Sequence, residues 1–149
     1  MDTNQPIHSE HFLVRDFVAG DYEAIVSLWE SIGLGGRHRG DNEDVILRTL
    51  NSGGRMLVLE NMLDHRIIGT SWMTVDGRRT YLHHFGIATD WQGRKLGQFL
   101  MDATMKVARE IGYQVKLEVH RTNQAAVNLY KKYGFEFLGD YDVYIIRSI

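Results

Sequence analysis

The chain has 149 residues, a formal net charge of −2 and no cysteine, and these properties exclude several classes of protein. Its length suits a single domain over 1–149, which would bury about 68–70% of the surface of the unfolded chain. Without cysteine there are no disulfides, no thiolate metal ligands and no cysteine nucleophile. The charge lacks the basic excess typical of nucleic-acid binders. No apolar leader or 18-residue apolar run occurs, so we expect a cytoplasmic protein with no membrane partner.

The first third of the chain predicts one strand and two short helices after a loosely held lead-in at residues 1–10. A short apolar run at 12–17 predicts the strand. Asp21 then suits the N-cap of a helix, because the apolar residues after it recur every three or four positions as far as Ile32. After a glycine-rich loop, a second short helix is expected to begin near Asp41.

The rest of the chain alternates between strand and helix signals. Asp76-Gly77 is a hairpin signal, so the apolar runs on either side should pair antiparallel. Gly112 stands where a helix-terminating glycine belongs. The order describes one mixed α/β domain. It comprises strands at 55–60, 66–75 and 79–87, a helix at 97–111, a strand at 115–120, a helix at 123–133, and a closing strand pair at 135–138 and 141–147.

The turn between the strand at 79–87 and the following helix has the composition of a phosphate site. It contains Gly93, Arg94, Lys95 and Gly97 at a helix start. Backbone N–H groups there have no carbonyl partner within the helix, and the helix dipole adds positive potential. The spacing matches neither the G-x-x-x-x-G-K-[ST] loop of nucleotide triphosphatases nor the G-x-G-x-x-G turn of dinucleotide-binding domains. A solvated basic turn is the alternative interpretation.

A second group of polar residues follows on the next strand and helix. Lys116, Glu118 and His120 share one face of the expected strand. Asn123 and Tyr130 are separated by about 700° around a helix and so share one helix face. These two faces are expected to line one cleft. Each residue also has a plainer interpretation: a solvated carboxylate for Glu118, a helix cap for Asn123 and a packed ring for Tyr130.

Two blocks of the sequence resemble signatures of the GCN5-related N-acetyltransferase (GNAT) superfamily. Gln92–Gly97 resembles the superfamily's Q/R-x-x-G-x-G/A coenzyme A loop, with Lys95 in the place of the usual first loop glycine. Leu117–Phe135 resembles the block L-E-V-x-x-x-N-x-x-A-x-x-L-Y-x-x-x-G-F. The similarity covers residues 80–140, and its coenzyme half is most like the ribosomal-protein N-terminal acetyltransferase branch.

The resemblance implies a GNAT-like fold with a mixed, mostly antiparallel sheet of about seven strands, helices on both faces and a splayed central strand pair. It also implies an enzyme that moves the acetyl group from acetyl-CoA to a primary amine of a small molecule or of a peptide or protein. The amine would attack directly in a ternary complex, since no cysteine is present to carry the acetyl group. No metal is implied. The alternative function is a non-catalytic acyl-CoA-binding sensor or interaction module.

The resemblance also implies roles for particular residues. The coenzyme pyrophosphate would bind backbone amides of the turn, and the pantetheine arm would pair with the main chain of the preceding strand. A strand amide would stabilise the oxyanion. Asn123 would hydrogen-bond the coenzyme arm, and Tyr130 would protonate the leaving thiolate. The implied coenzyme-binding residues are Phe85, Gly86, Ile87, Gly93, Arg94, Lys95, Leu96, Gly97, Gln98 and Asn123.

The reaction also needs a base, because a primary amine with a pKa of ~10 is mostly protonated at pH 7. Glu118 matches the base of the N-terminal acetyltransferase branch and is assigned as base or water-positioning group. His83, His84 and His120 are rivals, because an imidazole titrates near neutrality. The alternation of a strand predicts that His83 and His84 point to opposite faces.

The loop at 33–42 would border the acceptor in this fold, and its charges favour no single acceptor. Arg37 and Arg39 suit an acidic acceptor, whereas the acidic residues between Asp41 and Asp44 suit a cationic one. A glycine-rich loop with solvated charges is the alternative. We expect acetyl-CoA and an amine as partners and no nucleic acid, and the sequence leaves open whether the chain forms a homodimer.

Overall fold

The computed structural model describes residues 9–35 and 39–149. Most of the expected lead-in, residues 1–8, and Arg37 of the expected acceptor loop lie outside these ranges. The chain divides into two compact units, Met1–Glu118 and Val119–Ile149. The larger unit holds the sheet, and the smaller unit holds the last helix.

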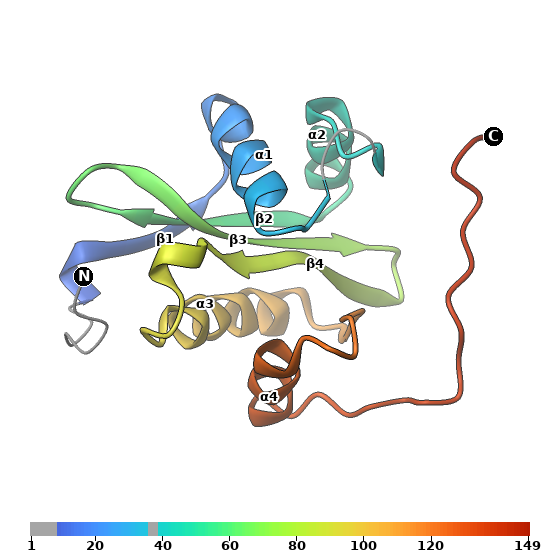
Figure 1. Cartoon of the computed structure of the whole chain (residues 1–149). Coiled ribbons are helices and arrows are strands. Elements are labelled where there is room, and N and C mark those ends of the chain that lie inside the picture. The colour runs from blue at the N-terminus through green and yellow to red at the C-terminus, as the bar shows by residue number, and fades with distance from the viewer. Residues whose placement is uncertain (1–8, 36–38) are drawn as a thin grey trace. The chain divides into compact units, whose positions relative to one another are not determined.

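The larger unit is built on one five-stranded sheet whose strands follow the order of the chain (Figure 1). Neighbouring strands run antiparallel as far as the fourth, and the fifth pairs parallel with the fourth. The hairpin expected at Asp76-Gly77 is confirmed, because the strands on either side pair directly. The strands are β1 (Phe12–Asp16), β2 (Arg55–Asn61), β3 (Arg66–Val75), β4 (Arg79–Ile87) and β5 (Gln114–Leu117).

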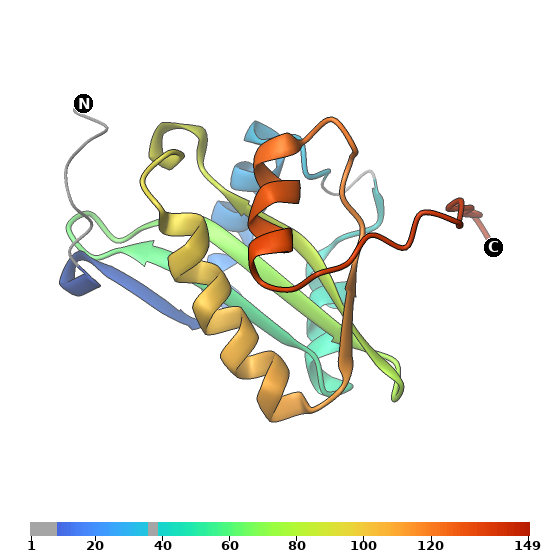
Figure 2. The same ribbon diagram turned by 90° about the horizontal axis from the view of Figure 1, so that it is seen from below.

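Helices α1 (Tyr22–Ser31) and α2 (Glu43–Asn51) cover one face of this sheet, and α3 (Leu96–Ile111) covers the other (Figures 1 and 2). Adjacent residues of β3 reach opposite layers. The indole of Trp72 donates to Thr49 Oγ1 of α2 at 2.9 Å. The hydroxyl of Ser71 instead lies 2.8 Å from that of Thr104 in α3. Short 3₁₀ turns precede β1, α1 and the turn into α3: η1 (Ser9–His11), η2 (Ala19–Asp21) and η4 (Thr89–Trp91).

The core lies between the sheet and its two helical layers. Trp29 of α1 stacks on Trp72 of β3, with ring centroids 5.9 Å apart and an angle of 8° between the planes. An aromatic side chain of this kind buries about 150–250 Å², so the pair contributes strongly to holding α1 on the sheet. Other fully buried side chains come from every layer: Ile25, Ile46, Met56, Leu59, Ile68, Met73, Leu96, Leu100 and Met101.

Single residues explain where the helices begin and end. Gly112 ends α3 as predicted: it is left-handed, with a φ of +87°, and its N–H donates to the carbonyl of Ala108 at 2.9 Å. Asn42 caps α2, because its Oδ1 accepts from Val45 N–H at 3.0 Å. Asp21 does precede α1, but its carboxylate makes no capping bond to that helix.

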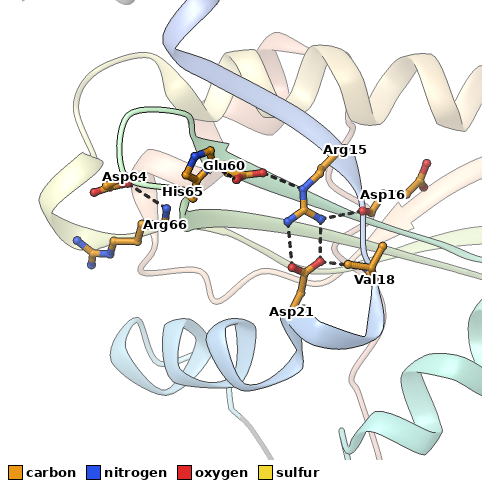
Figure 3. Close-up of polar contacts among 8 residues, drawn as sticks. All are labelled: Arg15, Asp16, Val18, Asp21, Glu60, Asp64, His65 and Arg66. Atoms are coloured by element: carbon orange, nitrogen blue, oxygen red, sulfur yellow. Dashed lines mark hydrogen bonds and ion pairs between the residues drawn. The ribbon is translucent and has the colours of Figure 1, made fainter.

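The carboxylate of Asp21 instead belongs to an ion-pair network that joins β1, β2 and the turn before α1 (Figure 3). Arg15 donates to both oxygens of Asp21, at 2.8 and 2.9 Å, and to Glu60 at 2.9 Å. Val18 N–H also donates to Asp21, and His65 Nδ1 lies 2.9 Å from Glu60. Both carboxylates are buried. The network therefore fixes β1 against β2 and against the start of α1.

The smaller unit contains α4 (Gln124–Lys132), followed by a segment without regular secondary structure. The closing strands predicted at 135–138 and 141–147 are therefore wrong. Their apolar side chains face solvent, since Phe137 is 89% exposed and Tyr144 is 90% exposed. Apolar residues that favour strands do not make a strand by themselves, because a strand needs a neighbour to pair its N–H and C=O groups. The described residues form five strands rather than about seven.

The last strand of the sheet is also shorter than predicted. The strand expected at 115–120 ends at Leu117, so Glu118 and His120 lie beyond it and do not share a strand face with Lys116. The β4–β5 ladder covers Arg79–Leu82 of β4 and the whole of β5, which ends at Leu117. Residues 83–87 of β4 therefore have no ladder partner in β5, the last strand of the described sheet, and the splayed central pair stays a prediction.

Candidate active site

A β-bulge in β4 shapes the part of the sheet expected to hold the pantetheine arm. Thr70 of β3 pairs with Gly86 of β4. Two residues further along β3, Trp72 pairs with His83, so β4 holds one extra residue between these pairs. His84 lies in this bulge with a φ of +47°. A non-glycine residue at positive φ is uncommon and persists only where its surroundings hold it.

Two hydrogen bonds hold the bulge from the side of α1. The Thr70 hydroxyl donates to the carbonyl of His84 at 2.6 Å. The buried indole N–H of Trp29 donates to the Thr70 oxygen at 2.8 Å. Helix α1 thus fixes the main chain of β4 through one threonine of β3.

The bulge brings both neighbouring histidines onto one face of the sheet. The ring centroids of His83 and His84 lie 5.9 and 5.4 Å from that of Trp72. The prediction that they point to opposite faces is wrong, because the extra residue of the bulge breaks the alternation of the strand.

The His84 ring is buried between two tryptophans and faces a carboxylate. Its centroid lies 4.3 Å from that of Trp29, and its side chain is 13% exposed. Its Nε2 lies 3.2 Å from Oδ2 of Asp41, which stands two residues before α2. Asp41 was predicted near the start of the second helix and as a charge in the acceptor loop, and the structure brings it to the bulge.

His83 is the more exposed of the two histidines. Its Nε2 lies 2.9 Å from the hydroxyl of Thr74. Partial desolvation and the neighbouring His84 lower the pKa of His83, and Asp41 and Glu118 oppose that shift. The neutral imidazole is therefore favoured near pH 7, which is the form that accepts a proton.

The main chain of Phe85–Ile87 lies beyond the end of the β4–β5 ladder. On one side it is closely covered: a Cβ added to Gly86 would meet Ile32 Cδ1 at 2.7 Å and Leu34 Cδ1 at 2.9 Å. A side chain at position 86 would therefore require the side chains of Ile32 and Leu34 to shift. The three residues expected to pair with the pantetheine arm thus have no ladder partner in β5.

The predicted phosphate turn follows β4 after the short 3₁₀ turn η4. The Gln92 side chain donates to the carbonyl of Ile87 at 2.9 Å and ties the turn to the end of the strand. Gly93 has a φ of +79°, and a Cβ there would meet nothing within 4 Å. The first turn of α3 then begins at Leu96, with its N–H groups directed out of the helix end. This open helix start suits a phosphate ligand.

Lys95 adopts the backbone conformation that glycine favours. Its φ is +62°, and it occupies the N-cap of α3 without a side-chain capping bond. A left-handed non-glycine residue is disfavoured by about 1 kcal/mol. Beside it, the Arg94 guanidinium lies 4.7 Å from the ring of Trp91. Gly93, Arg94, Lys95, Leu96, Gly97 and Gln98 therefore form one continuous turn and helix start with two cationic side chains.

The expected base, Glu118, is exposed and lies one residue past β5. It is close enough to His83 to raise the pKa of that imidazole. The third rival, His120, belongs to the smaller unit, where its Nδ1 lies 2.7 Å from the Thr122 hydroxyl.

The remaining candidates, Asn123 and Tyr130, lie in the smaller unit. Asn123 caps α4, since its Oδ1 accepts from Ala126 N–H at 3.3 Å. Tyr130 is buried, and its ring lies edge-on to Phe135 at 5.7 Å. Burial raises the pKa of Tyr130 to about 12, so the phenol is protonated at neutral pH. The plainer roles of cap and packed ring are confirmed for both residues, and their roles toward the coenzyme stay predictions.

Two further properties concern the residues that the structure describes. No helix in 9–35 or 39–149 is long and apolar enough to cross a membrane. Within the same ranges, no three His, Cys, Asp or Glu side chains are grouped so that they could hold a metal ion.

Comparison with known proteins identifies the family. The model of the acetyltransferase (GNAT) family matches residues 22–135, so the chain belongs to this family. An acetyltransferase from Pectobacterium atrosepticum is 29% identical over 125 residues, which cover 83% of this chain and 86% of the relative.

Solved structures share the fold. A GNAT acetyltransferase from Staphylococcus aureus has a TM-score of 0.76 at 20% identity and covers 88% of this chain and 89% of its own. A GNAT acetyltransferase from Elizabethkingia anophelis was solved with acetyl-CoA bound. It has a TM-score of 0.62 at 19% identity, and the match covers 85% of this chain and 77% of its own. Other similar folds include a ribosomal-protein-S18-alanine N-acetyltransferase and an aminoglycoside acetyltransferase, both 17% identical. The ribosomal-protein branch is therefore not singled out.

Proposed function

We propose that the chain is an N-acetyltransferase that moves the acetyl group of acetyl-CoA to a primary amine by direct attack in a ternary complex. One observation carries this proposal beyond family membership. The bulged end of β4 leads through the short turn η4 to the helix-start turn, and the Gln92–Ile87 hydrogen bond of 2.9 Å ties the two together. This arrangement supports a strand main chain that would hold the pantetheine arm and a linked helix start that would hold the pyrophosphate.

The coenzyme-binding residues act mainly through the backbone. The amides from Gly93 to Gln98 would hold the pyrophosphate, with Arg94 and Lys95 adding positive charge. The main chain of Phe85–Ile87 would hold the pantetheine arm. A backbone N–H of this segment, aimed at the thioester carbonyl oxygen, would stabilise the negative charge that develops on it. Asn123 would contact the coenzyme arm through the part of its amide that does not cap α4.

The reaction requires two proton movements. The amine loses a proton as its nitrogen bonds to the acetyl carbon, and the C–S bond breaks to release a thiolate that takes up a proton. Glu118 is proposed as the base or as the group that positions a water for this role. The lowered pKa of His83 keeps that residue as the rival base. Tyr130, protonated at neutral pH, is proposed to supply the proton to the thiolate.

The acceptor is proposed to be a primary amine of a small molecule or of a peptide or protein. Calorimetric titration with acetyl-CoA, followed by thiol release with tyramine, spermidine, free amino acids and N-terminally free peptides, tests this function. We expect binding of acetyl-CoA and amine-dependent thiol release from at least one member of this panel. Binding without acceleration by any of these amines would overturn the proposed transfer to an amine.

Lys95 supports a second candidate function, a non-catalytic acyl-CoA sensor. A lysine with a φ of +62° stands where the superfamily's loop usually has a glycine, and this departure is the feature that keeps a binding module without turnover as the alternative. The same two measurements separate the candidates, because the sensor predicts tight acetyl-CoA binding and no thiol release above the rate without protein.

A further inference from the structure

We propose that His84 is a positioning residue that, through Asp41, holds the segment entering α2 against the bulge of β4 and so determines how well the acceptor amine binds. This inference rests on the proposed acetyl transfer. It concerns acceptor binding and not the chemical step, because neither ring nitrogen of His84 is exposed to solvent.

The backbone of His84 is held in place by its surroundings. A φ of +47° is uncommon for a residue other than glycine and persists where the surroundings hold it. The Thr70 hydroxyl holds the His84 carbonyl by donating to it at 2.6 Å, and Trp29 fixes that threonine in turn. The ring is therefore directed to one place, between Trp29 and Trp72.

The ring has one charged neighbour in contact among the described residues. Its Nε2 lies 3.2 Å from Oδ2 of Asp41, in a geometry that is electrostatic rather than a well-aligned hydrogen bond. The two side chains are only 13% and 20% exposed, so water replaces the contact poorly if one partner is removed. Loss of either side chain should therefore release the other.

The contact fixes residues 39–42, which lead into α2, at the point where Asp41 meets His84. Asp41 is followed by Asn42, the N-cap of α2, so the contact also sets where α2 begins. A nucleophile that approaches a thioester held on Phe85–Ile87 from the face of α1 and α2 passes along this segment. Movement of the segment should weaken acceptor binding and leave coenzyme binding intact.

Asparagine at position 84 tests this role without removing the bulge, because asparagine tolerates positive φ. We would compare His84→Asn, Asp41→Asn and the double variant in thiol release, with the panel amine that reacts fastest as the probe. Each single variant should raise KM for that amine about tenfold with kcat changed less than about threefold, as expected when uniform binding is lost. The double variant should be no worse than either single variant, because one contact is lost in all three. Unchanged KM, or effects that simply add, would overturn the proposal.

His65→Asn is the matched control. His65 is also a histidine at positive φ, +59°, and also contacts a carboxylate, Glu60 at 2.9 Å, but it lies in the β2–β3 turn. The His65→Asn variant should leave KM for the amine and the affinity for acetyl-CoA unchanged. Amide hydrogen exchange at 39–45, which needs no acceptor, should become faster in the variants at 84 and 41 only. Unchanged amide exchange in these two variants would overturn the contact between His84 and Asp41. A wild-type chain that acetylates no amine would overturn the proposed function, and amide exchange would then still decide whether the contact exists.

Discussion

The guanidinium of Arg15 donates to both carboxylate oxygens of Asp21, at 2.8 and 2.9 Å, and so links β1 to the start of α1. Asp21 is 7% exposed, and its other contact is the N–H of Val18. Removing one partner of a buried pair costs more than breaking a surface ion pair, because the remaining charge is left uncompensated. The Arg15–Asp21 ion pair therefore stabilises the edge of the sheet formed by β1, whereas the bulge lies in β4.

Acid should unfold the protein partly through this network. The hydrogen bond from Arg15 lowers the pKa of Asp21, and Arg15 and His65 lower that of Glu60. A carboxyl group with a lowered folded-state pKa adds stability that is fully present above its unfolded value, about 3.9 for Asp and about 4.3 for Glu. That stability is lost as the pH falls through the lower folded value. Urea unfolding between pH 7 and pH 3 should show it as a falling free energy of unfolding.

Asp21→Asn should remove part of this acid dependence and lower the free energy of unfolding at pH 7 by about 2–3 kcal/mol. Asp90→Asn is the control, because Asp90 forms an exposed ion pair with Arg66, with side chains 52% and 54% exposed. An exposed pair contributes about 0–1 kcal/mol. Equal losses in the two variants would show that burial of the Arg15 pair does not matter.

Lys95 should destabilise the chain through its backbone, since its φ of +62° suits glycine better. Lys95→Gly should be more stable than Lys95→Ala by about 0.5–1 kcal/mol, because both lack the ammonium and only alanine keeps the strain. Urea unfolding of the two variants measures this difference. Equal stability would mean that the turn relaxes at no cost.

The same two variants separate backbone from side chain in coenzyme binding. If the amides of the turn hold the pyrophosphate, Lys95→Gly should bind acetyl-CoA as tightly as the wild type or more tightly. A clear loss of affinity in Lys95→Gly, seen by calorimetric titration, would assign the binding to the ammonium group instead.

Local sequence patterns correctly predicted the strands and helices that pack against the rest of the larger unit. The hairpin at Asp76-Gly77 and the helix ended by Gly112 are present because local turn chemistry determines both. The closing strands at 135–138 and 141–147 are absent, although both stretches are rich in the aromatic and aliphatic residues that strands favour. Composition of this kind favours a strand, but it does not supply the partner edge that a strand requires.

The candidate site could be predicted only where it depends on single positions. Gln92 and the glycine-bearing turn follow from sequence, because helix starts and glycine turns are local features. The bulge at His84 could not be predicted, since it depends on the register of β3 against β4. Asp41 reaches His84 across 43 positions of the chain through a fold-dependent contact of 3.2 Å. Adjacent histidines within a strand carried no signal that both would face Trp72.

Glu118→Gln should lower kcat/KM for the amine at pH 7 by about 10²-fold, as loss of a general base does. The rate should recover as the pH approaches the pKa of the amine, because the free amine then needs no base. Glu136→Gln, an exposed glutamate beyond α4, is the control and should leave the pH profile unchanged. An unaltered profile in Glu118→Gln would favour His83, whose lowered pKa predicts an acid limb below its ordinary value of about 6.5.

Tyr130→Phe should lower kcat by about 10²-fold or more, with little change in acetyl-CoA affinity, if the phenol protonates the leaving thiolate. Because burial raises the pKa of Tyr130 to about 12, its hydroxyl stays protonated from pH 6 to about pH 10, and the wild-type kcat should show no ionisation from it in that range. Tyr133→Phe, at the C-cap of the same helix, removes an equivalent hydroxyl and should leave kcat unchanged. Steady-state thiol release and calorimetric titration of the three proteins measure these quantities. If Tyr130→Phe turns over as fast as Tyr133→Phe, Tyr130 serves α4 as a packed ring and the thiolate takes its proton from another donor.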